Sequence, residues 1–331
     1  MTYRLSVLDL SPVGGDNTPA QAVRESIEVA KAAERLGYHR FWVAEHHNLK
    51  SLASAAPEIL IAAVSQVTSS IRLGSGGVML VNYSPLKVAE VFMELEALAP
   101  GRIDLGVGRA LGTDMRTGGA LRSSGSEAFP QFFALLSAWL LDASGRETIT
   151  DSHPAREIHA SPAGPSHPDL FLLCTSVDSA IFAGQAGVGM VFAEFIARTD
   201  AGPAIAAYRQ AFVPSPFRDV PWAGTALIAL AADTTYEAIR LDLPRRASNL
   251  ATLQGERRRF PTIAEAEDFL ARHVGSPALA GIIDRSIAGD ADKVKAALDA
   301  KAASTGADEI FVMASGPTLE SRVRSLELLR P

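Results

Sequence analysis

Short apolar runs alternate with amphipathic stretches along almost the whole chain. Continuous apolar runs are typical of parallel strands that are buried on both faces. The runs predicted as strands are Leu5–Leu8, Arg40–Val43, Ile71–Leu80, Ile103–Val107, Leu170–Thr175, Gly189–Ala193, Ala226–Ala231 and Glu309–Met313. Between them apolar residues recur at helical spacing. The first helix is predicted to begin at Thr18-Pro19, where Gln21 completes a Thr-x-x-Gln capping box, and to end near Gly37.

Strands that alternate with helices in this number predict an α/β fold, a (β/α)₈ TIM barrel, formed as one domain over residues 1–331. A doubly wound open sheet is the alternative, although it usually has fewer strands at this length. Two stretches interrupt the alternation and are expected to be insertions. Residues 143–168 are rich in Pro, Gly, Ser and His, and residues 249–285 contain one short predicted helix near Ile263–His273. We expect the second stretch to act as a lid, because long connections in compact domains are often functional.

Composition narrows the class of protein. Of 331 residues 47% are hydrophobic and 21% are charged, with a net charge of −6, as in ordinary globular proteins. Without a basic excess, nucleic acids and anionic membranes are not expected partners. No apolar run approaches the ~18 residues of a membrane helix, and the N-terminus lacks signal-peptide features, so we expect a cytoplasmic protein. The single Cys174 excludes an internal disulfide and a multi-cysteine metal site.

The densest titratable cluster is Glu45-His46-His47, which follows the second predicted strand. In a TIM barrel the catalytic groups come from the carboxyl ends of strands. Adjacent histidines on an extended segment point to opposite sides, so at most one of them faces the barrel mouth. That histidine is a candidate general acid/base or metal ligand, and the other one is expected to pack or cap.

A second candidate feature is an anion site. Thr175, Ser176 and Ser179 open a helix directly after a buried strand, where hydroxyls and free backbone N–H groups can bind a phosphate. Plain N-capping is the other interpretation. Arg109, just past the fourth strand, is placed either to supply a fixed positive charge or to lie on the surface.

Glycines in two strands differ in what they indicate. Gly106-x-Gly108-x-x-x-Gly112 resembles a dinucleotide fingerprint, but the spacing is one residue too long and no helix is expected next. Glycines inside a strand often mark the close approach of a ligand to the backbone. Gly76 and Gly77 therefore predict a gap in the third strand that would admit a flat ring.

The same residues lie in segments that resemble the bacterial luciferase-like flavin monooxygenases, most closely their FMN-linked branch. The segments span nearly the whole chain in the order of that family: FWVAEHH (41–47), SAAPEILIAA (54–63), IRLGSGGVML (71–80), SPLKVAE (84–90), LEALAPGRIDLGVGRALGTD (95–114), LLCTSVDSAIFAGQAGVGMVFA (172–193) and TGADEIFVM (305–313).

The resemblance implies an enzyme with a TIM-like barrel that binds reduced FMN at its mouth. A separate flavin reductase supplies FMNH₂, which reacts with O₂ to a C4a-peroxide that oxygenates a small-molecule substrate. Baeyer-Villiger oxidation, hydroxylation and epoxidation all stay open. Tailoring of a secondary metabolite, such as an aromatic polyketide in antibiotic biosynthesis, fits this chemistry. The family also implies a homodimer.

The motifs of the family assign roles to residues of this chain. His46 matches the catalytic histidine, and Arg109 matches the arginine at the flavin phosphate. The phosphate-binding turn is matched by Thr175, Ser176 and Ser179. The segment beneath the isoalloxazine, where the family often has a non-proline cis peptide, is matched by Gly76 and Gly77. The expected substrate-pocket residues are Leu10, Met79 and Glu194.

Four positions depart from the pattern of the family. Val81 and Tyr83 stand where this branch often has Pro and His, and Glu194 stands where related sequences often have Ser or His. Thr175 replaces an acidic residue of luciferase itself. These changes bear on the substrate more than on the flavin site.

Three rival functions remain open on the sequence. A deazaflavin (F420)-dependent oxidoreductase on the same barrel would transfer a hydride and ignore O₂. A metal-dependent hydrolase would use Asp9, His46 and an acidic partner as ligands, but no His-x-His pair supports it, and we expect no metal. A non-catalytic flavin-binding protein is the third.

Overall fold

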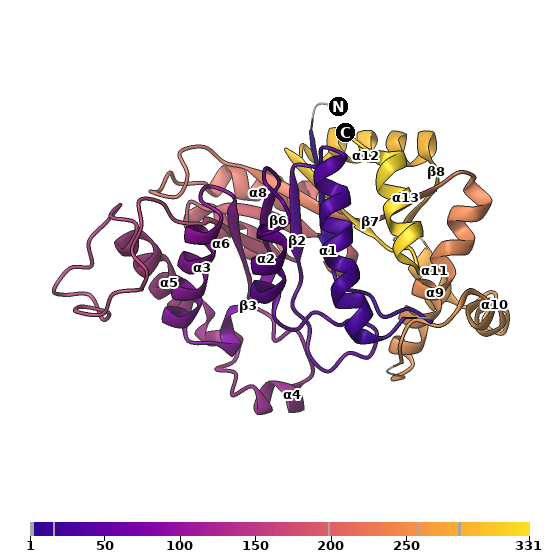
Figure 1. Cartoon of the computed structure of the whole chain (residues 1–331), viewed down its shortest axis with the longest axis horizontal. Coiled ribbons are helices and arrows are strands. Elements are labelled where there is room, and N and C mark those ends of the chain that lie inside the picture. The colour runs from indigo at the N-terminus through magenta and orange to yellow at the C-terminus, as the bar shows by residue number, and fades with distance from the viewer. Residues whose placement is uncertain (1–2, 16, 198, 257, 284–285) are drawn as a thin grey trace.

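A closed barrel of parallel strands forms the centre of the computed structural model, which describes residues 3–15, 17–197, 199–256, 258–283 and 286–331 (Figure 1). Its strands are β1 (Arg4–Asp9), β2 (Arg40–Val43), β3 (Arg72–Met79), β4 (Ile103–Gly108), β5 (Asp169–Cys174), β6 (Gly189–Ala193), β7 (Ala223–Ala232) and β9 (Glu309–Ala314). Each strand pairs with the next, β7 pairs with β9, and β9 returns to β1. The prediction of a (β/α)₈ barrel is confirmed, and the open-sheet alternative is wrong because the ring closes.

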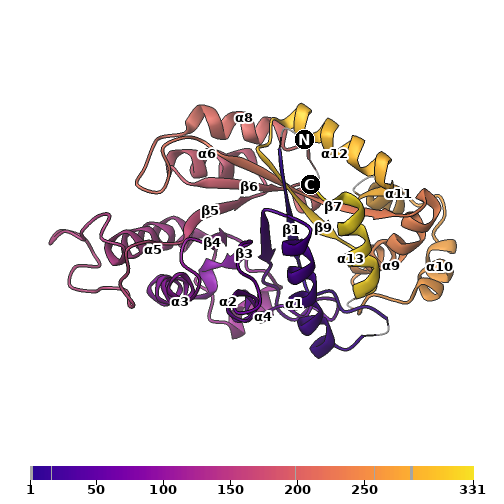
Figure 2. The same ribbon diagram turned by 45° about the horizontal axis from the view of Figure 1, so that its top comes forward.

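Helices surround the barrel (Figure 2). They are α1 (Pro19–Arg35), α2 (Pro57–Ser65), α3 (Pro85–Leu98), α4 (Met115–Ala120), α5 (Phe129–Ala143), α6 (Val177–Gln185), α7 (Glu194–Ala197), α8 (Gly202–Ala211), α9 (Thr235–Leu253), α10 (Ile263–Ala271), α11 (Pro277–Ile283), α12 (Ala291–Thr305) and α13 (Leu319–Leu329). The described residues also form two 3₁₀ turns, Leu80–Asn82 and Ser126–Ala128. The predicted capping box opens α1: Gln21 N donates to Thr18 Oγ1, and Thr18 N donates to Gln21 Oε1.

A short additional strand, β8 (Ser286–Asp290), pairs with the end of β7 outside the barrel ring. The apolar pattern does not predict it. Its sequence, SIAGD, lies at an edge where only two of five residues are buried, so no continuous apolar run is needed there.

The two stretches predicted as insertions differ in structure. Residues 144–168 contain neither helix nor strand. The described part of 249–285 holds the end of α9 together with α10 and α11, which form a small apolar cluster of their own around Ala247, Leu250 and Phe269. Figure 1 shows this helical group at the side of the barrel, beyond β7. The single-domain organisation itself stays a prediction.

Side chains of one buried ionic network hold the barrel strands together near their amino ends. Arg40 on β2 pairs with Asp104 on β4 at 2.6 Å and with Glu309 on β9 at 3.2 Å. Arg72 on β3 reaches the other oxygen of Asp104 at 2.6 Å. This network lies at the opposite end of the barrel from the carboxyl ends of the strands.

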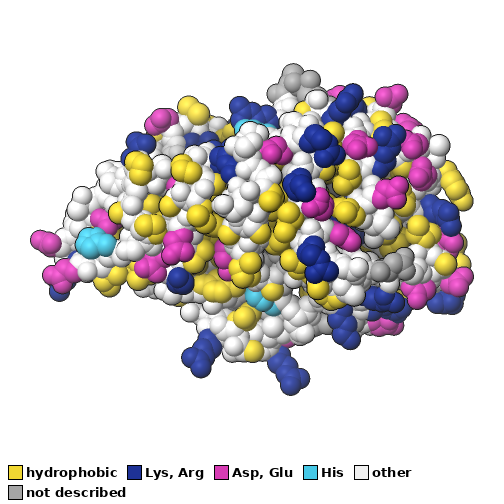
Figure 3. Space-filling view, in the orientation of Figure 1, with side chains coloured by type: hydrophobic (Ala, Val, Ile, Leu, Met, Phe, Trp, Pro, Cys, Tyr) yellow, Lys and Arg dark blue, Asp and Glu magenta, His cyan; other side chains and the backbone are white. Residues whose placement is uncertain are grey.

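Acidic and basic side chains are interspersed over the face drawn in Figure 3, with basic side chains extending at the lower edge, where Figure 1 places α4. Among the described residues no helix is both long and apolar enough to cross a membrane.

Candidate active site

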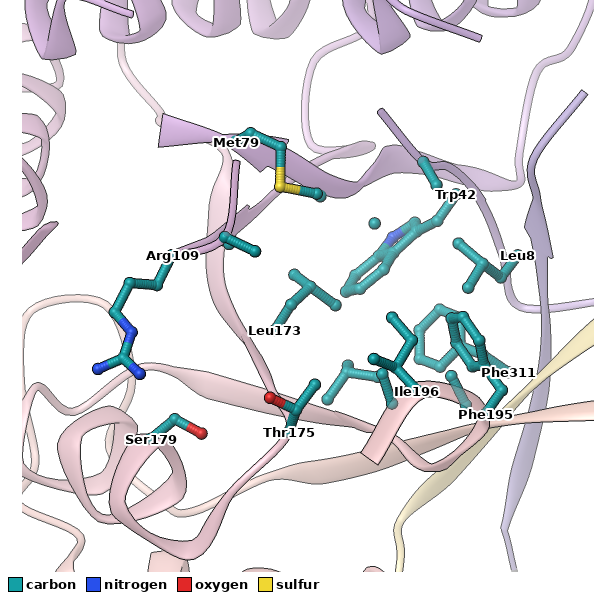
Figure 4. Close-up of a pocket in the computed structure, with 18 of the residues that line it drawn as sticks. Leu8, Trp42, Met79, Arg109, Leu173, Thr175, Ser179, Phe195, Ile196 and Phe311 are labelled. Carbon is teal, nitrogen blue, oxygen red and sulfur yellow. The ribbon is translucent and has the colours of Figure 1, made fainter. Parts of the chain in front are cut away.

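A cavity of about 290 Å³ opens at the carboxyl ends of the barrel strands (Figure 4). Its lining brings together most of the residues that the sequence singled out, although they come from four different strands and the segments after them. Those residues are His46, Gly76, Gly77, Met79, Arg109, Thr175, Ser176 and Ser179. Parallel strands explain the convergence, because all their carboxyl ends meet at one face of the barrel.

One end of the cavity is polar. Ser176 caps α6: Ser179 N donates to Ser176 Oγ at 3.2 Å, and Ser176 N donates to Ser179 Oγ at 3.2 Å. The N–H groups of Val177 and Asp178 belong to the first turn, where a helix offers them no internal acceptor. Figure 4 shows the guanidinium of Arg109 directed toward Ser179. An exposed cation beside a helix N-terminus forms a site for a phosphate.

His46 lies on the cavity wall, and its backbone N–H donates to the carbonyl of Ser54 at 2.9 Å. Its Nδ1 is buried and has no hydrogen-bond partner within the described residues. Burial, and secondly the neighbouring His47, lower the pKa of His46 to about 4. The imidazole is therefore neutral at neutral pH.

The second histidine has a different task, as the alternation argument predicts. His47 Nε2 contacts Glu45 Oε1 at 2.7 Å, and the same buried carboxylate accepts from Tyr83 Oη at 2.8 Å and from Met79 N at 2.9 Å. Burial and then Glu45 raise the pKa of Tyr83. Glu45 thus fixes the end of β3 at the cavity.

The sequence interpretation missed this role of Glu45. Its signal was present, since residues i and i+2 of an extended segment share a face, and Glu45 and His47 have that spacing. Tyr83, one of the departures from the family pattern, completes the cluster.

The floor of the cavity beside β3 is bare backbone. The peptide between Gly76 and Gly77 is cis, as predicted. A Cβ on Gly76 would lie 2.7 Å from Leu8 Cδ1, and one on Gly77 would lie 2.6 Å from the carbonyl oxygen of Gly106. Neither position has room for a side chain, so a flat surface faces the cavity.

Two expected substrate-pocket residues lie elsewhere. Glu194 accepts from Ala201 N at 3.0 Å and pairs with Lys301 on α12 at 3.0 Å, so its carboxylate is used by the outer helices. Leu10 is half-buried and packs against the apolar cluster around Trp42 without lining the cavity. Both expectations followed from position at a strand end, which fixes the neighbourhood of a residue but not the direction of its side chain.

Residues 249–285, which we expected to act as a lid, do not lie over the cavity in the part that the structure describes. No described residue of 249–285 lines the cavity. Instead Phe260 N donates to the carbonyl of Val13, which places this segment against the loop after β1.

Apolar residues make up most of the rest of the lining, beside Gly108 and Ser126. They are Leu8, Trp42, Ala44, Ala110, Leu173, Val191, Ala193, Phe195, Ile196, Ala226 and Phe311. Most of them lie in runs predicted as buried strands, whereas Phe195 and Ile196 lie on α7. Only the closed ring shows which of the strand residues face this space.

The alternative function of a metal-dependent hydrolase is not supported by the surroundings of Asp9. Its carboxylate accepts from Ser26 and from Arg322 Nη1 at 3.2 Å, which commits it to α1 and α13. Among the residues that the structure describes, no three His, Cys, Asp or Glu side chains gather as a metal site requires.

Comparison with known proteins decides the family. The model of the luciferase-like monooxygenase family matches residues 3–309. The chain belongs to the luciferase-like monooxygenase family. The chain is also 36% identical over 330 residues to the luciferase-like monooxygenase of Escherichia coli K12, covering 99% of this chain and 96% of that protein. To the protein YwcH of Bacillus subtilis it is 37% identical over 333 residues, covering 98% of both.

Solved structures agree on the fold of this luciferase-like monooxygenase. The crystal structure of apo-MsnO8 matches with a TM-score of 0.89 at 37% identity, covering 99% of this chain and 97% of that one. The oxygenating constituent of 3,6-diketocamphane monooxygenase from Pseudomonas putida, solved with FMN, matches at 0.72 and 19% identity, covering 99% and 96%. An F420-dependent secondary alcohol dehydrogenase matches at 0.68 and 14%, covering all of both chains. The predictions of the family and of a monooxygenase-class enzyme are confirmed, whereas the two distant structures show the fold alone.

Proposed function

We propose that this chain is the oxygenating component of a two-component flavin system. It takes reduced FMN from a separate flavin reductase and uses O₂ to oxygenate a small organic substrate. The observation that carries the proposal is one cavity that joins a phosphate-type end, Arg109 with the α6 N-terminus, to a neutral His46 on an apolar wall. The proposal keeps a homodimer, a cytoplasmic location and a secondary-metabolite substrate as predictions.

The residues present fit FMN. Arg109, Ser176 and Ser179 would hold the phosphate, and the side-chain-free backbone at Gly76-Gly77 would lie against the ring system. The buried, unpartnered Nδ1 of His46 is the kind of atom that a bound polar group satisfies.

Reduced FMN supplies two electrons for the activation of O₂, so that one oxygen atom enters the substrate, the other leaves as water, and FMN is regenerated. The protein contributes the surroundings. Neutral His46 can accept a proton at Nδ1 or hold one there, as a general acid/base must. Leu173, Phe195 and Phe311 exclude water from the reacting atoms. Glu45 keeps Met79 and the end of β3 in place.

The decisive experiment is anaerobic titration of the protein with FMNH₂ and, separately, with F420H₂, followed by admission of O₂ in a stopped-flow spectrometer. We expect FMNH₂ to bind and its oxidation kinetics to change relative to free FMNH₂. Arg109→Ala should weaken FMNH₂ binding about 10- to 100-fold, the loss of one charged hydrogen-bonded contact.

Arg116→Ala is the matched control, because Arg116 is exposed on α4 and does not line the cavity. Its affinity for FMNH₂ should equal that of the unmodified protein. Tight binding of F420H₂ with no response to O₂ would overturn the proposal in favour of hydride transfer. Binding of FMNH₂ with no change in its oxidation would leave a flavin-binding protein without oxygenase activity.

A further inference from the structure

The two ends of the cavity differ in what they offer a ligand (Figure 4). Arg109 and Ser179 lie at one end, whereas Leu8, Phe195 and Phe311 lie at the other. Among the described lining residues Arg109 is the one with a permanently charged side chain. Under the proposed function that charge belongs to the phosphate of FMN, so none is left for a second anion.

Among the described side chains at the apolar end, the indole of Trp42 carries the one hydrogen-bond donor, and that donor is already paired. The indole of Trp42 lines the cavity, yet its Nε1–H donates to Asp104 at 2.9 Å, on the side of the buried ionic network. The ring therefore presents carbon to the cavity. Its position is fixed by Phe311, at 4.4 Å between ring centroids, and by Phe171, at 5.1 Å. An ionised group placed here would lose its hydration without gaining a partner, which is strongly unfavourable.

Small residues create the space at this end. Ala193 on β6 and Ala226 on β7 are register partners, and both line the cavity. Because paired residues of neighbouring strands point to the same face, the two methyl groups lie side by side. A larger side chain at either position would occupy the volume that a substrate needs.

We infer that the substrate is an electrically neutral organic molecule whose apolar part, aliphatic or aromatic, is bound between Trp42, Phe311 and the Ala193–Ala226 pair. This inference rests on the proposed function, because it assigns Arg109 to the cofactor. Carboxylates, sulfonates and phosphate esters are excluded as the group bound at this end. Ala193 and Ala226 determine how large the apolar part is.

The test uses two probes with one skeleton, N-phenyl-1-naphthylamine, which is neutral, and 1-anilinonaphthalene-8-sulfonate, which carries a sulfonate. Their affinities are measured by calorimetry on FMN-loaded protein and on the Arg109→Ala variant without FMN. We expect the neutral probe to bind at least tenfold more tightly in both. Equal affinity, preference for the sulfonate, or no binding of the neutral probe would overturn the inference.

Ala226→Leu locates the binding. It should weaken binding of the neutral probe at least tenfold. Ala193→Val should also weaken this binding, and it keeps the test decisive if Ala226→Leu does not fold. Binding that persists in both variants lies elsewhere and contradicts the inference. Because the Arg109→Ala arm needs no flavin, failure of FMN to bind counts against the proposed function, while the probe preference still decides the substrate class.

Discussion

At the scale of single residues, burial decides what each polar group of the site can do. His46 and His47 are neighbours in sequence, but His46 lines the cavity with a buried, unpartnered Nδ1, whereas His47 is bound to Glu45. The difference arises from the alternation of an extended chain. Burial keeps His46 neutral at neutral pH, because the charged imidazolium would lose its hydration in this wall.

The lowered pKa of His46 predicts a pH dependence of stability. The folded-state pKa is about 4, against about 6.5 in the unfolded chain. Between these values the unfolded chain binds a proton that the folded protein does not, so the free energy of unfolding falls as the pH is lowered from 6.5 to 4. His46 accounts for at most about 3 kcal/mol of this fall in the free energy of unfolding.

Urea unfolding at several pH values checks this expectation. His46→Gln should flatten the profile between pH 6.5 and 4 relative to the unmodified protein, while the two proteins keep parallel profiles above pH 7. Parallel profiles throughout would show that His46 titrates alike in the folded and unfolded states.

At the scale of elements, the start of α6 combines a structural and a binding role. Ser176 occupies the same capping position as Thr18 at the start of α1, and both close a capping box. Only the α6 box lies on the cavity. The two helices therefore offer matched positions that separate capping from phosphate binding.

We expect Thr18→Ala and Ser176→Ala each to lower the free energy of unfolding by about 1 kcal/mol, the usual loss of an N-cap hydrogen bond. Their effects on FMNH₂ affinity should differ: Ser176→Ala weakens it severalfold and Thr18→Ala leaves it unchanged. Denaturant unfolding and anaerobic titration on the same preparations provide both quantities. Equal affinities in the two variants would reduce Ser176 to a helix cap.

At the scale of the whole molecule, the buried ionic network fixes the barrel strands against one another below the cavity. Asp104 is fully buried and accepts from Arg40, Arg72 and Trp42. The two guanidinium groups hold the pKa of Asp104 below its usual range, although burial by itself acts to raise it. Since Trp42 also lines the cavity, the network and the site share one wall.

Asp104→Ala should destabilise the protein by about 3–5 kcal/mol, because it leaves buried cations without their partner. Asp169→Ala is the control. Asp169 also pairs with Arg72, at 3.1 Å, but its side chain is 39% exposed, so its removal should cost less than about 1 kcal/mol. Thermal or urea unfolding measures both. Similar losses for the two variants would contradict the argument that burial sets the difference.

The amino-acid sequence was sufficient to predict the barrel strands and the strand ends at which the candidate site residues gather. Continuous apolar runs mark strands that are buried on both faces, and the eight runs predicted as strands correspond to the barrel ring. Motifs at strand ends indicated His46, Arg109 and the start of α6, because parallel strands bring their carboxyl ends together. Among the described strands, β8 was not predicted, because an edge strand buries little apolar surface. The short helices α2, α4, α7 and α11 were not predicted either.

Which side chains face the cavity became clear from the three-dimensional structure alone. Glu194 and Leu10 stand at strand ends, yet Glu194 turns toward Lys301 and Leu10 packs beside the cavity. The sequence pattern places Trp42 and Phe311 in the barrel core, and the structure shows that both line the cavity. The physical reason is that side-chain direction depends on barrel closure, strand register and the partners contributed by distant elements, none of which is encoded in a local pattern.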